Sequence, residues 1–203
     1  MKKKLFKIAT VVCMSVGVML AGQVTVLADE VKPMHEYTFD YDDDSTIYDS
    51  IIGKKAINGI GAGSELITGY DGKGKARYLD GSNYLAFSSL TLPVGTVSIR
   101  FKFKKDSTSV AKRTEPIISC SSQKELFYIG IGKYNNYEIP GSLWIYRKDN
   151  AEDNFELQTP KSICDGQWHD ILFTWDGTKN TNSAKLYVDD MTTPISQTTA
   201  LLT

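Results

Sequence analysis

Apolar and polar positions alternate with a period of two over much of the chain after residue 36, which is typical of β-strands that bury one face. The clearest run is Ser98–Lys104, which places its isoleucine and phenylalanines on one face and its basic residues on the other. Lys185–Asp189 alternates in the same way. Both runs therefore predict half-buried antiparallel strands.

Three further runs carry apolar groups on both faces, as expected of inner strands in a layered structure. They are Leu126–Ile131, Leu143–Arg147 and Trp168–Trp175. Asn-Gly and Asp-Gly pairs mark turns between the runs, and no window of a dozen residues has the pattern of an amphipathic helix. Many short strands with closely spaced turns predict an all-β sandwich or jelly roll. Because no linker or repeat interrupts residues 37–203, we expect a single domain there.

The first residues have the pattern of an export signal rather than of a domain. A lysine-rich start precedes the apolar run Ile8–Leu20, and Val26 and Ala28 provide a small-residue cleavage site. A membrane-spanning helix needs about 20 apolar residues, so this run is too short for one. We predict a signal peptide over residues 1–28, a short segment over 29–36, a secreted product, and contact with a membrane only during export.

Composition and charge narrow the classes of function. The 203 residues are 41% hydrophobic and 23% charged, which excludes a disordered or collagen-like chain. Lys and Arg number 23 against 24 Asp and Glu, so we do not expect nucleic acid as a partner. Loss of the signal would leave Cys120 and Cys164. These two could form a disulfide in an oxidising compartment, or remain as two small buried thiols.

Several groups of residues, in chain order, resemble the bacterial laminin-G-like domain of the concanavalin A-like lectin/glucanase superfamily. They are Tyr48–Ser50, Ala56–Gly59, Gly74–Leu85, Asp165–Gly177 and Leu186–Asp189. The resemblance implies a concanavalin A-like jelly-roll sandwich over residues 37–203. Members of this family usually continue beyond the position of Leu202 with a further strand, so we expect this domain to lack its last strand or strands.

The candidates for catalysis are weak. His169 and Asp170 are neighbours on a predicted strand, so their side chains should point to opposite faces and not act as base and orienting acid. Glucanases of this fold use carboxylates that alternate along one strand, whereas the acids in Glu152–Glu156 begin with an adjacent pair. We therefore expect a protein that is not an enzyme.

The residues that best fit a ligand lie in a predicted hairpin loop. Tyr134 and Tyr137 flank Asn135 and Asn136, and this combination offers the stacking faces and bidentate hydrogen bonds that sugars require. The same residue types are also common in ordinary polar turns. Arg100, in the outward row of its strand, could receive the carboxylate of an acidic sugar, although such a row is also typical of a solvated sheet face.

An acidic run offers a possible cofactor site. Asp40, Asp42 and Asp44 could supply oxygen ligands to calcium on a flexible loop. An EF-hand is excluded, because Ser45 stands at the position that requires glycine. The alternative is a solvated turn, which runs of charge usually form.

Together these features predict a secreted, non-catalytic module that binds carbohydrate or glycoprotein. Two alternatives stay open at this point. One is an adhesion module that binds protein, and the other is an accessory amino-terminal piece of a larger secreted glycosidase. The sequence leaves the ligand and the oligomeric state open.

Overall fold

The computed structural model describes residues 6–14, 33–40, 42–43, 46–55, 59–60, 65–70, 72–80, 84–86, 96–106, 115–121, 125–132, 139–149 and 155–198. The elements in these ranges are all strands. They are β1 (Phe6–Met14), β2 (His35–Tyr37), β3 (Tyr48–Asp49), β4 (Lys54–Lys55), β5 (Gly59–Ile60), β6 (Glu65–Thr68), β7 (Lys75–Leu79), β8 (Leu85–Ala86), β9 (Val97–Lys105), β10 (Glu115–Ser121), β11 (Glu125–Ile131), β12 (Leu143–Asp149), β13 (Phe155–Gln158), β14 (Trp168–Trp175), β15 (Ala184–Val188) and β16 (Ser196–Thr198). Within the same ranges, no helix has the length and apolar character to span a membrane.

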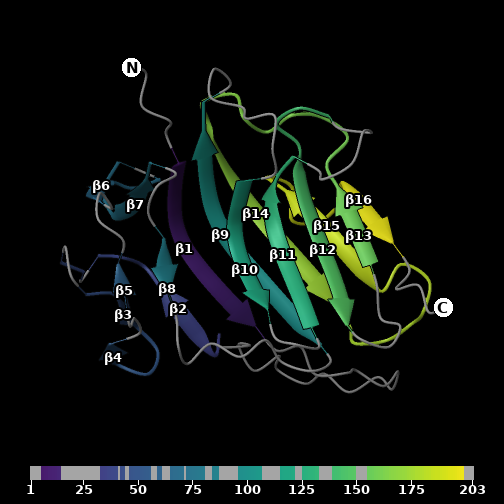
Figure 1. Ribbon diagram of the computed structural model, residues 1–203, viewed down its shortest axis with the longest axis horizontal. Helices are drawn as coiled ribbons and strands as arrows, with labels where there is room; N and C mark the ends of the chain where they lie inside the picture. Colours follow the sequence, from purple (N-terminus) through teal and green to yellow (C-terminus); the bar gives the residue numbers. More distant parts are fainter. Residues whose placement is uncertain are drawn as a thin grey trace.

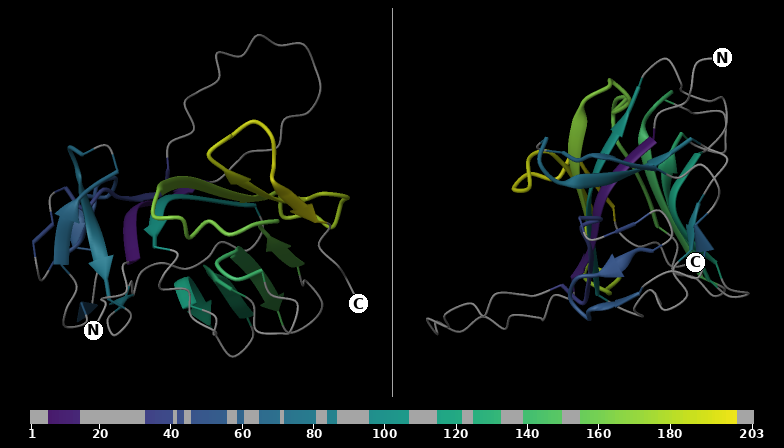
Figure 2. Two further views of the ribbon diagram at one scale, coloured as in Figure 1. Left: turned by 90° about the horizontal axis from the view of Figure 1, so that it is seen from above. Right: turned by 90° about the vertical axis from the view of Figure 1, so that its left-hand side faces the viewer.

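Two antiparallel sheets form the body of the molecule (Figure 1). The larger has eight strands in the order β16-β15-β14-β9-β1-β7-β6, with β2 pairing to β1. The smaller has four strands in the order β10-β11-β12-β13 and lies in front of the larger sheet in Figure 1. Figure 2 shows the two layers from the side. The sandwich confirms the all-β prediction, and its layers explain the alternating pattern.

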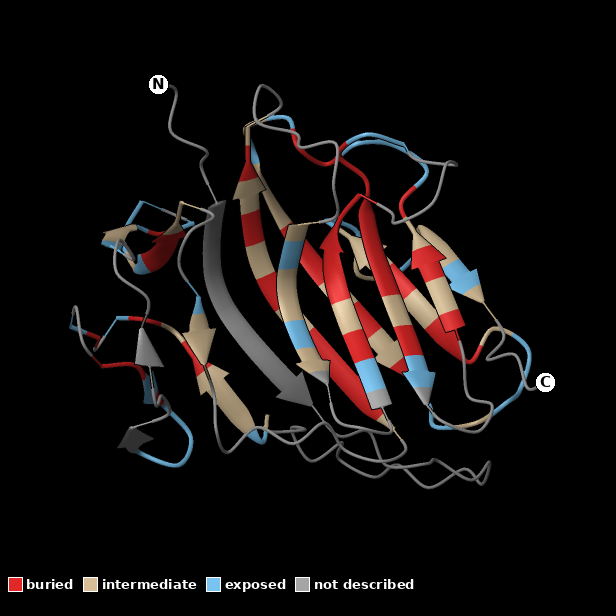
Figure 3. Cartoon of the chain, in the orientation of Figure 1, coloured by how far each residue is buried: buried red, intermediate tan, exposed pale blue. Residues whose placement is uncertain are grey.

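The hydrophobic core lies between the sheets and is built mainly from the facing sides of β9, β11, β12, β13, β14 and β15 (Figure 3). Ile99, Phe101 and Phe103 of β9 are at most 1% exposed, whereas the basic residues between them face outward. Across the interface, Phe127 of β11 packs on Phe173 of β14, with ring centroids 5.7 Å apart. The predicted strand patterns of β9, β14 and β15 are therefore confirmed, and burial of their apolar face follows from the two-residue period.

An inner position of the larger sheet, between β9 and β7, is held by β1, which lies in the predicted export signal. Its backbone pairs with β9 from Phe6↔Lys105 to Met14↔Ser98, and it also pairs with β7 and β2. Strand β2 begins at His35, inside the segment predicted to precede the domain. Strand pairing in the structure therefore extends to both predicted segments before residue 37. In Figure 1, β1 is the long purple strand beside β9.

Candidate functional site

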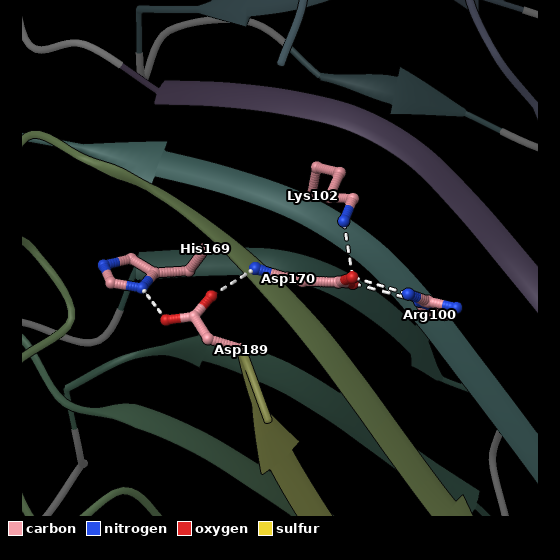
Figure 4. Close-up of polar contacts among 5 residues, drawn as sticks. All are labelled: Arg100, Lys102, His169, Asp170 and Asp189. Carbon is pink, nitrogen blue, oxygen red and sulfur yellow. Dashed lines mark hydrogen bonds and ion pairs between the residues drawn. The ribbon is translucent and has the colours of Figure 1, made fainter. Parts of the chain in front are cut away.

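Arg100, the basic residue singled out from the sequence, lies on the outward face of β9 and is bound to β14 (Figure 4). Its Nε donates to Asp170 Oδ1 at 3.0 Å and its Nη2 to Asp170 Oδ2 at 2.6 Å. Lys102, which lies opposite Asp170 in the strand register, forms an ion pair with the same carboxylate. Arg100, Lys102 and Asp170 are called the Arg100 cluster below.

The carboxylate of Asp170 pairs with both cations of the Arg100 cluster. Burial by itself raises the pKa of Asp170, but the hydrogen bonds and charges of Arg100 and Lys102 outweigh it and hold that pKa below its ordinary value. The same hydrogen bonding raises the pKa of Arg100. Two of the donor nitrogens of Arg100 are therefore occupied within the chain, and the cluster ties β9 to β14.

Two aromatic rings adjoin the Arg100 cluster. Lys102 Nζ lies 4.4 Å from the centroid of the Tyr70 ring, and Tyr70 meets Trp168 edge-on with centroids 6.1 Å apart. Tyr70 is 49% exposed. This side of the larger sheet thus has an accessible aromatic surface, but the charged groups beside it already have partners.

His169 and Asp170 point to opposite sides of β14, as their adjacent positions predict. The imidazole Nδ1 of His169 lies 2.8 Å from Asp189 Oδ2, and its Nε2 lies 3.1 Å from Asp165 Oδ1. Asp189 also accepts the backbone N–H of Asp170 through Oδ1, at 2.9 Å. This imidazole therefore joins the end of β15 to the turn before β14, and it does not contact the carboxylate of Asp170.

The second histidine, His35, is bound to a buried carboxylate. Its Nδ1 lies 2.6 Å from Oδ2 of Asp49, whose side chain is not exposed at all. Oδ1 of Asp49 also accepts the backbone N–H groups of Ile51 and Ile52, at 3.0 and 3.3 Å. These hydrogen bonds outweigh the effect of burial and lower the pKa of Asp49. The pair joins β2 to β3.

Two carboxylates of the acidic run considered for calcium accept backbone hydrogen bonds, and one of them adjoins the buried Arg77. Asp40 Oδ1 accepts the backbone N–H of Lys75 at 2.7 Å, and Asp42 Oδ1 accepts that of Tyr48 at 3.0 Å. Arg77 Nη2 lies 3.5 Å from Asp42 Oδ2 and donates to the carbonyl of Thr46 at 3.3 Å. The positive charge beside the carboxylate of Asp42 in the structure is therefore the guanidinium of Arg77.

Burial has the largest effect on the carboxylate of Asp42. It raises the pKa of Asp42 despite the hydrogen bonds from Tyr48 and Arg77. Asp44, the third predicted ligand, lies outside the described residues. Within the described ranges, no group of three or more His, Cys, Asp or Glu side chains is arranged to hold a metal ion.

The remaining predicted residues fall into two sets. The loop residues Tyr134, Asn135, Asn136 and Tyr137 lie outside the described part of the chain. Cys120 of β10 and Cys164 are both free thiols in the structure, and Cys164 is buried. Burial raises the pKa of Cys164 to about 12, so this thiol stays protonated and is a poor nucleophile.

A third set of residues was not predicted as a site, although it covers the outer face of the smaller sheet. Trp144 and Tyr146 of β12 stack with centroids 5.2 Å apart and planes 20° apart. Tyr128 of β11 lies opposite Tyr146, and its ring centroid is 5.2 Å from that of Trp144. These three side chains are called the aromatic row below.

The neighbouring strand β13 adds polar groups to the aromatic row. Its register places Gln158 opposite Trp144 and Glu156 opposite Tyr146. Gln158 Nε2 donates to Ser142 Oγ at 2.7 Å, which fixes the orientation of this amide. The combination of aromatic surface with an amide and a carboxylate on one sheet face is suited to a hydroxyl-rich ligand.

A sequence signal for the aromatic row existed. The pattern predicts that the runs Leu126–Ile131 and Leu143–Arg147 are apolar on both faces, and their outer faces carry Tyr128, Trp144 and Tyr146 together with Leu126. Tyr and Trp prefer positions that are partly apolar and partly wet. The cross-strand proximity of Tyr128 and Trp144, however, depends on the strand register, which the sequence does not contain.

Comparison with known families agrees with this architecture. A laminin G model, described as the concanavalin A-like lectin/glucanases superfamily, matches residues 79–198, which is more than half of the chain. The chain therefore belongs to the concanavalin A-like lectin/glucanases superfamily, as its motifs predicted. Searches of curated proteins and of solved structures found no significant match. The matched residues include the aromatic row and the Arg100 cluster.

Proposed function

We propose that the protein is a secreted, non-catalytic carbohydrate-binding module and that the aromatic row is its binding surface. The observation that supports this most directly is the packing of three aromatic rings beside the polar side chains of β13: Trp144 stacks on Tyr146 and meets Tyr128 at a tilt. Membership of a superfamily that contains lectins and glucanases is consistent with a carbohydrate ligand. The signal-like start of the sequence supports secretion.

The physical argument for sugar binding concerns the two kinds of surface that a sugar presents. Its C–H faces pack on aromatic rings, and its hydroxyl groups need hydrogen-bond partners when they leave water. Tyr146 is only partly buried, and Glu156 and Gln158 beside it are also partly accessible. The Arg100 cluster suits this role less well, because its charged groups are paired with one another.

The contacts of His169 and Asp170, the candidate catalytic pair, support a non-catalytic role. His169 is held between two carboxylates, and its neighbour Asp170 is bound to two cations on the opposite face. Glu156 of β13 lies next to the aromatic row, opposite Tyr146 in the strand register. If Glu156 were a catalytic carboxylate, Glu156→Gln would abolish any hydrolysis of a bound glycan. We expect instead that neither the wild type nor this variant hydrolyses one, as measured by release of reducing sugar.

A glycan array probed with the full chain tests the proposed function. We expect binding to at least one glycan and a loss of about tenfold or more in affinity for Tyr146→Ala, since stacking contacts beyond burial contribute about 0.5–1.5 kcal/mol and the ring also removes apolar area from water. Tyr187→Ala, which removes a partly buried tyrosine from the larger sheet, is the matched control and should bind normally. Absence of binding to every glycan on the array would refute the proposal.

A protein-binding adhesion module is the second candidate function, and exposed apolar side chains near β3 favour it. Ile51 and Ile52 are 46% and 45% exposed in the turn that leads from β3 to β4, and Tyr48 of β3 is 40% exposed. Grouped exposed apolar side chains often mark surfaces that contact other proteins. Pull-down from extracellular-matrix extracts that resists competing sugars would favour this candidate over the first.

A further inference from the structure

Two hydrogen-bond donors at the centre of the aromatic row lack partners. The indole Nε1 of Trp144 and the hydroxyl of Tyr128 are buried from solvent, and neither forms a hydrogen bond. Trp144 as a whole is only 8% exposed. Buried polar groups are almost always paired in folded proteins, so two unpaired donors side by side call for an explanation.

Another tryptophan of the sandwich provides a contrast. The indole Nε1 of Trp175 donates to the carbonyl of Thr178 at 3.1 Å, and the charged atoms of the Arg100 cluster are paired with one another. The indole of Trp175, on the larger sheet, therefore has a partner within the chain. The two unpaired donors instead belong to rings whose centroids lie 5.2 Å apart on one face of the smaller sheet.

A glycine keeps the Tyr128 ring in this position. Gly130 lies opposite Trp144 in the register, on the same outer face as Tyr128. A Cβ atom at position 130 would lie 2.4 Å from Cε1 of Tyr128 and 2.6 Å from its hydroxyl oxygen. The phenol of Tyr128 therefore lies across the backbone of β11, and any residue larger than glycine at position 130 would displace its hydroxyl.

We infer that Trp144 and Tyr128 form a hydrogen-bonding subsite that donates to oxygen atoms of an uncharged sugar. This inference rests on the proposed carbohydrate-binding function and specifies the ligand chemistry of the same surface. An indole N–H can only donate a hydrogen bond, so its ligand partner must be an acceptor such as a hydroxyl or acetamido carbonyl oxygen.

Electrostatics support an uncharged ligand over an acidic one. Burial, and secondarily the charge of Glu115, raises the pKa of Tyr128 far above its ordinary value, so the phenol remains a protonated donor. Lys105 forms an ion pair with Glu115 at 2.7 Å, yet the carboxylate still acts on Tyr128. Glu156 borders the row on its other side. Among the described residues of this face, Lys148 is an exposed cation beyond Tyr146 on β12.

The test removes each donor while retaining an aromatic ring. The full chain, Tyr128→Phe and Trp144→Phe are titrated with neutral oligosaccharides and with their sialylated counterparts, for example lactose and 3′-sialyllactose. We expect preference for the neutral member of a pair, and a loss of about three- to tenfold in affinity for Tyr128→Phe, as is typical for one hydrogen bond. Tyr187→Phe is the matched control and should not change the affinity.

Stability separates a ligand contact from a purely structural role. Because the hydroxyl of Tyr128 has no partner in the unliganded chain, Tyr128→Phe should leave the melting temperature unchanged or raise it while weakening binding. An NMR titration adds a direct readout: the indole N–H resonance that is missing from Trp144→Phe should shift when the wild type binds sugar.

The outcomes distinguish this inference from the proposed function. Binding of a neutral glycan that both phenylalanine variants retain at full affinity would overturn the inference and leave the proposed function standing. Preference for the sialylated probe would also overturn it. A wild type that binds no carbohydrate would overturn both.

Discussion

At the residue scale, the balance of charge around Asp170 depends on contacts between residues far apart in the sequence. Its carboxylate is buried, and the ionised form remains favourable because Arg100 and Lys102 of the neighbouring strand donate to it. A buried carboxylate without such partners would instead raise its pKa and destabilise the fold. Arg100 could be placed on an outward strand face from the alternation alone, but its partner could not be identified, because pairing of β9 with β14 is a tertiary property.

Replacing Asp170 should cost stability. Asp170→Asn keeps the shape of the side chain but leaves Arg100 and Lys102 without a counter-charge. We expect the free energy of unfolding to fall by about 1 kcal/mol, a modest value because both cations are partly exposed to water. Urea unfolding provides the measurement. Glu65→Gln, at an exposed position of β6, is the control and should change little.

The contribution of Asp170 should also depend on pH. Because its folded pKa lies below the unfolded value of about 3.9, its contribution is fully present above that value and is lost as the pH falls through the folded pKa. The stability difference between wild type and Asp170→Asn should therefore be constant from pH 7 to about pH 5 and shrink on further acidification. A difference that persisted undiminished at the acid limit would contradict this assignment.

At the element scale, β11 depends on a glycine where a larger residue would be expected from its strand pattern. Gly130→Ala would bring the new methyl group within 2.6 Å of the carbonyl oxygen of Glu115 and closer still to the Tyr128 ring. We expect a loss of about 1–3 kcal/mol, as for other overpacked sites, together with a change in the near-UV circular dichroism of the aromatic row. Ser119→Ala on neighbouring β10 should leave that spectrum unchanged. Unaltered stability and spectrum in Gly130→Ala would exclude the close approach.

The strand β1 presents a different question, because its residues were predicted to be removed on export. In the structure this segment pairs with β9 on one side and β7 on the other. The two roles exclude each other in one molecule: a chain that has lost residues 1–28 exposes the unpaired backbone of β9 unless another extended segment takes the same place. Such an open edge favours association with other strands.

Deletion of residues 1–28, the predicted signal peptide, tests what β1 contributes to stability. We expect residues 29–203 alone to be less stable than the full chain by on the order of 5 kcal/mol, because β1 pairs with its neighbours over most of its length. A synthetic peptide of residues 6–14, added in trans, should raise the melting temperature of the shorter chain. In the full chain, Val11→Pro should be destabilising, because proline cannot donate to the strand ladder. Equal stability of the full chain, of residues 29–203 and of Val11→Pro would show that β1 is not part of the sheet.

Elements with a strong local pattern were the ones that could be predicted. Trp168–Trp175 is predicted as an inner strand because it carries apolar side chains on both faces, and it coincides with β14. The aromatic row illustrates what could not be predicted. Tyr128 and Trp144 come from different strands, and only the β11–β12 register brings their rings together. The site therefore depends on the register, whereas the strands depend on local alternation.

At the scale of the whole molecule, the two candidate binding surfaces lie on different parts of the sandwich. The aromatic row covers the smaller sheet, whereas the exposed isoleucines lie at the β3–β4 pair, which Figure 1 shows beside the sandwich and away from β12 and β13. Distinct positions allow the two functions to be separated by mutation.

Substitution of the exposed isoleucines should decide between the two functions. Ile51→Ser with Ile52→Ser removes apolar area from the surface while leaving their backbone N–H groups bound to Asp49. Because the side chains are about half exposed, we expect a change in stability of less than about 0.5 kcal/mol. Under the carbohydrate-binding proposal, glycan affinity should equal that of the wild type in isothermal titration calorimetry. If instead this double variant lost attachment to matrix proteins while Tyr146→Ala retained it, adhesion through protein contacts would be the function of the molecule.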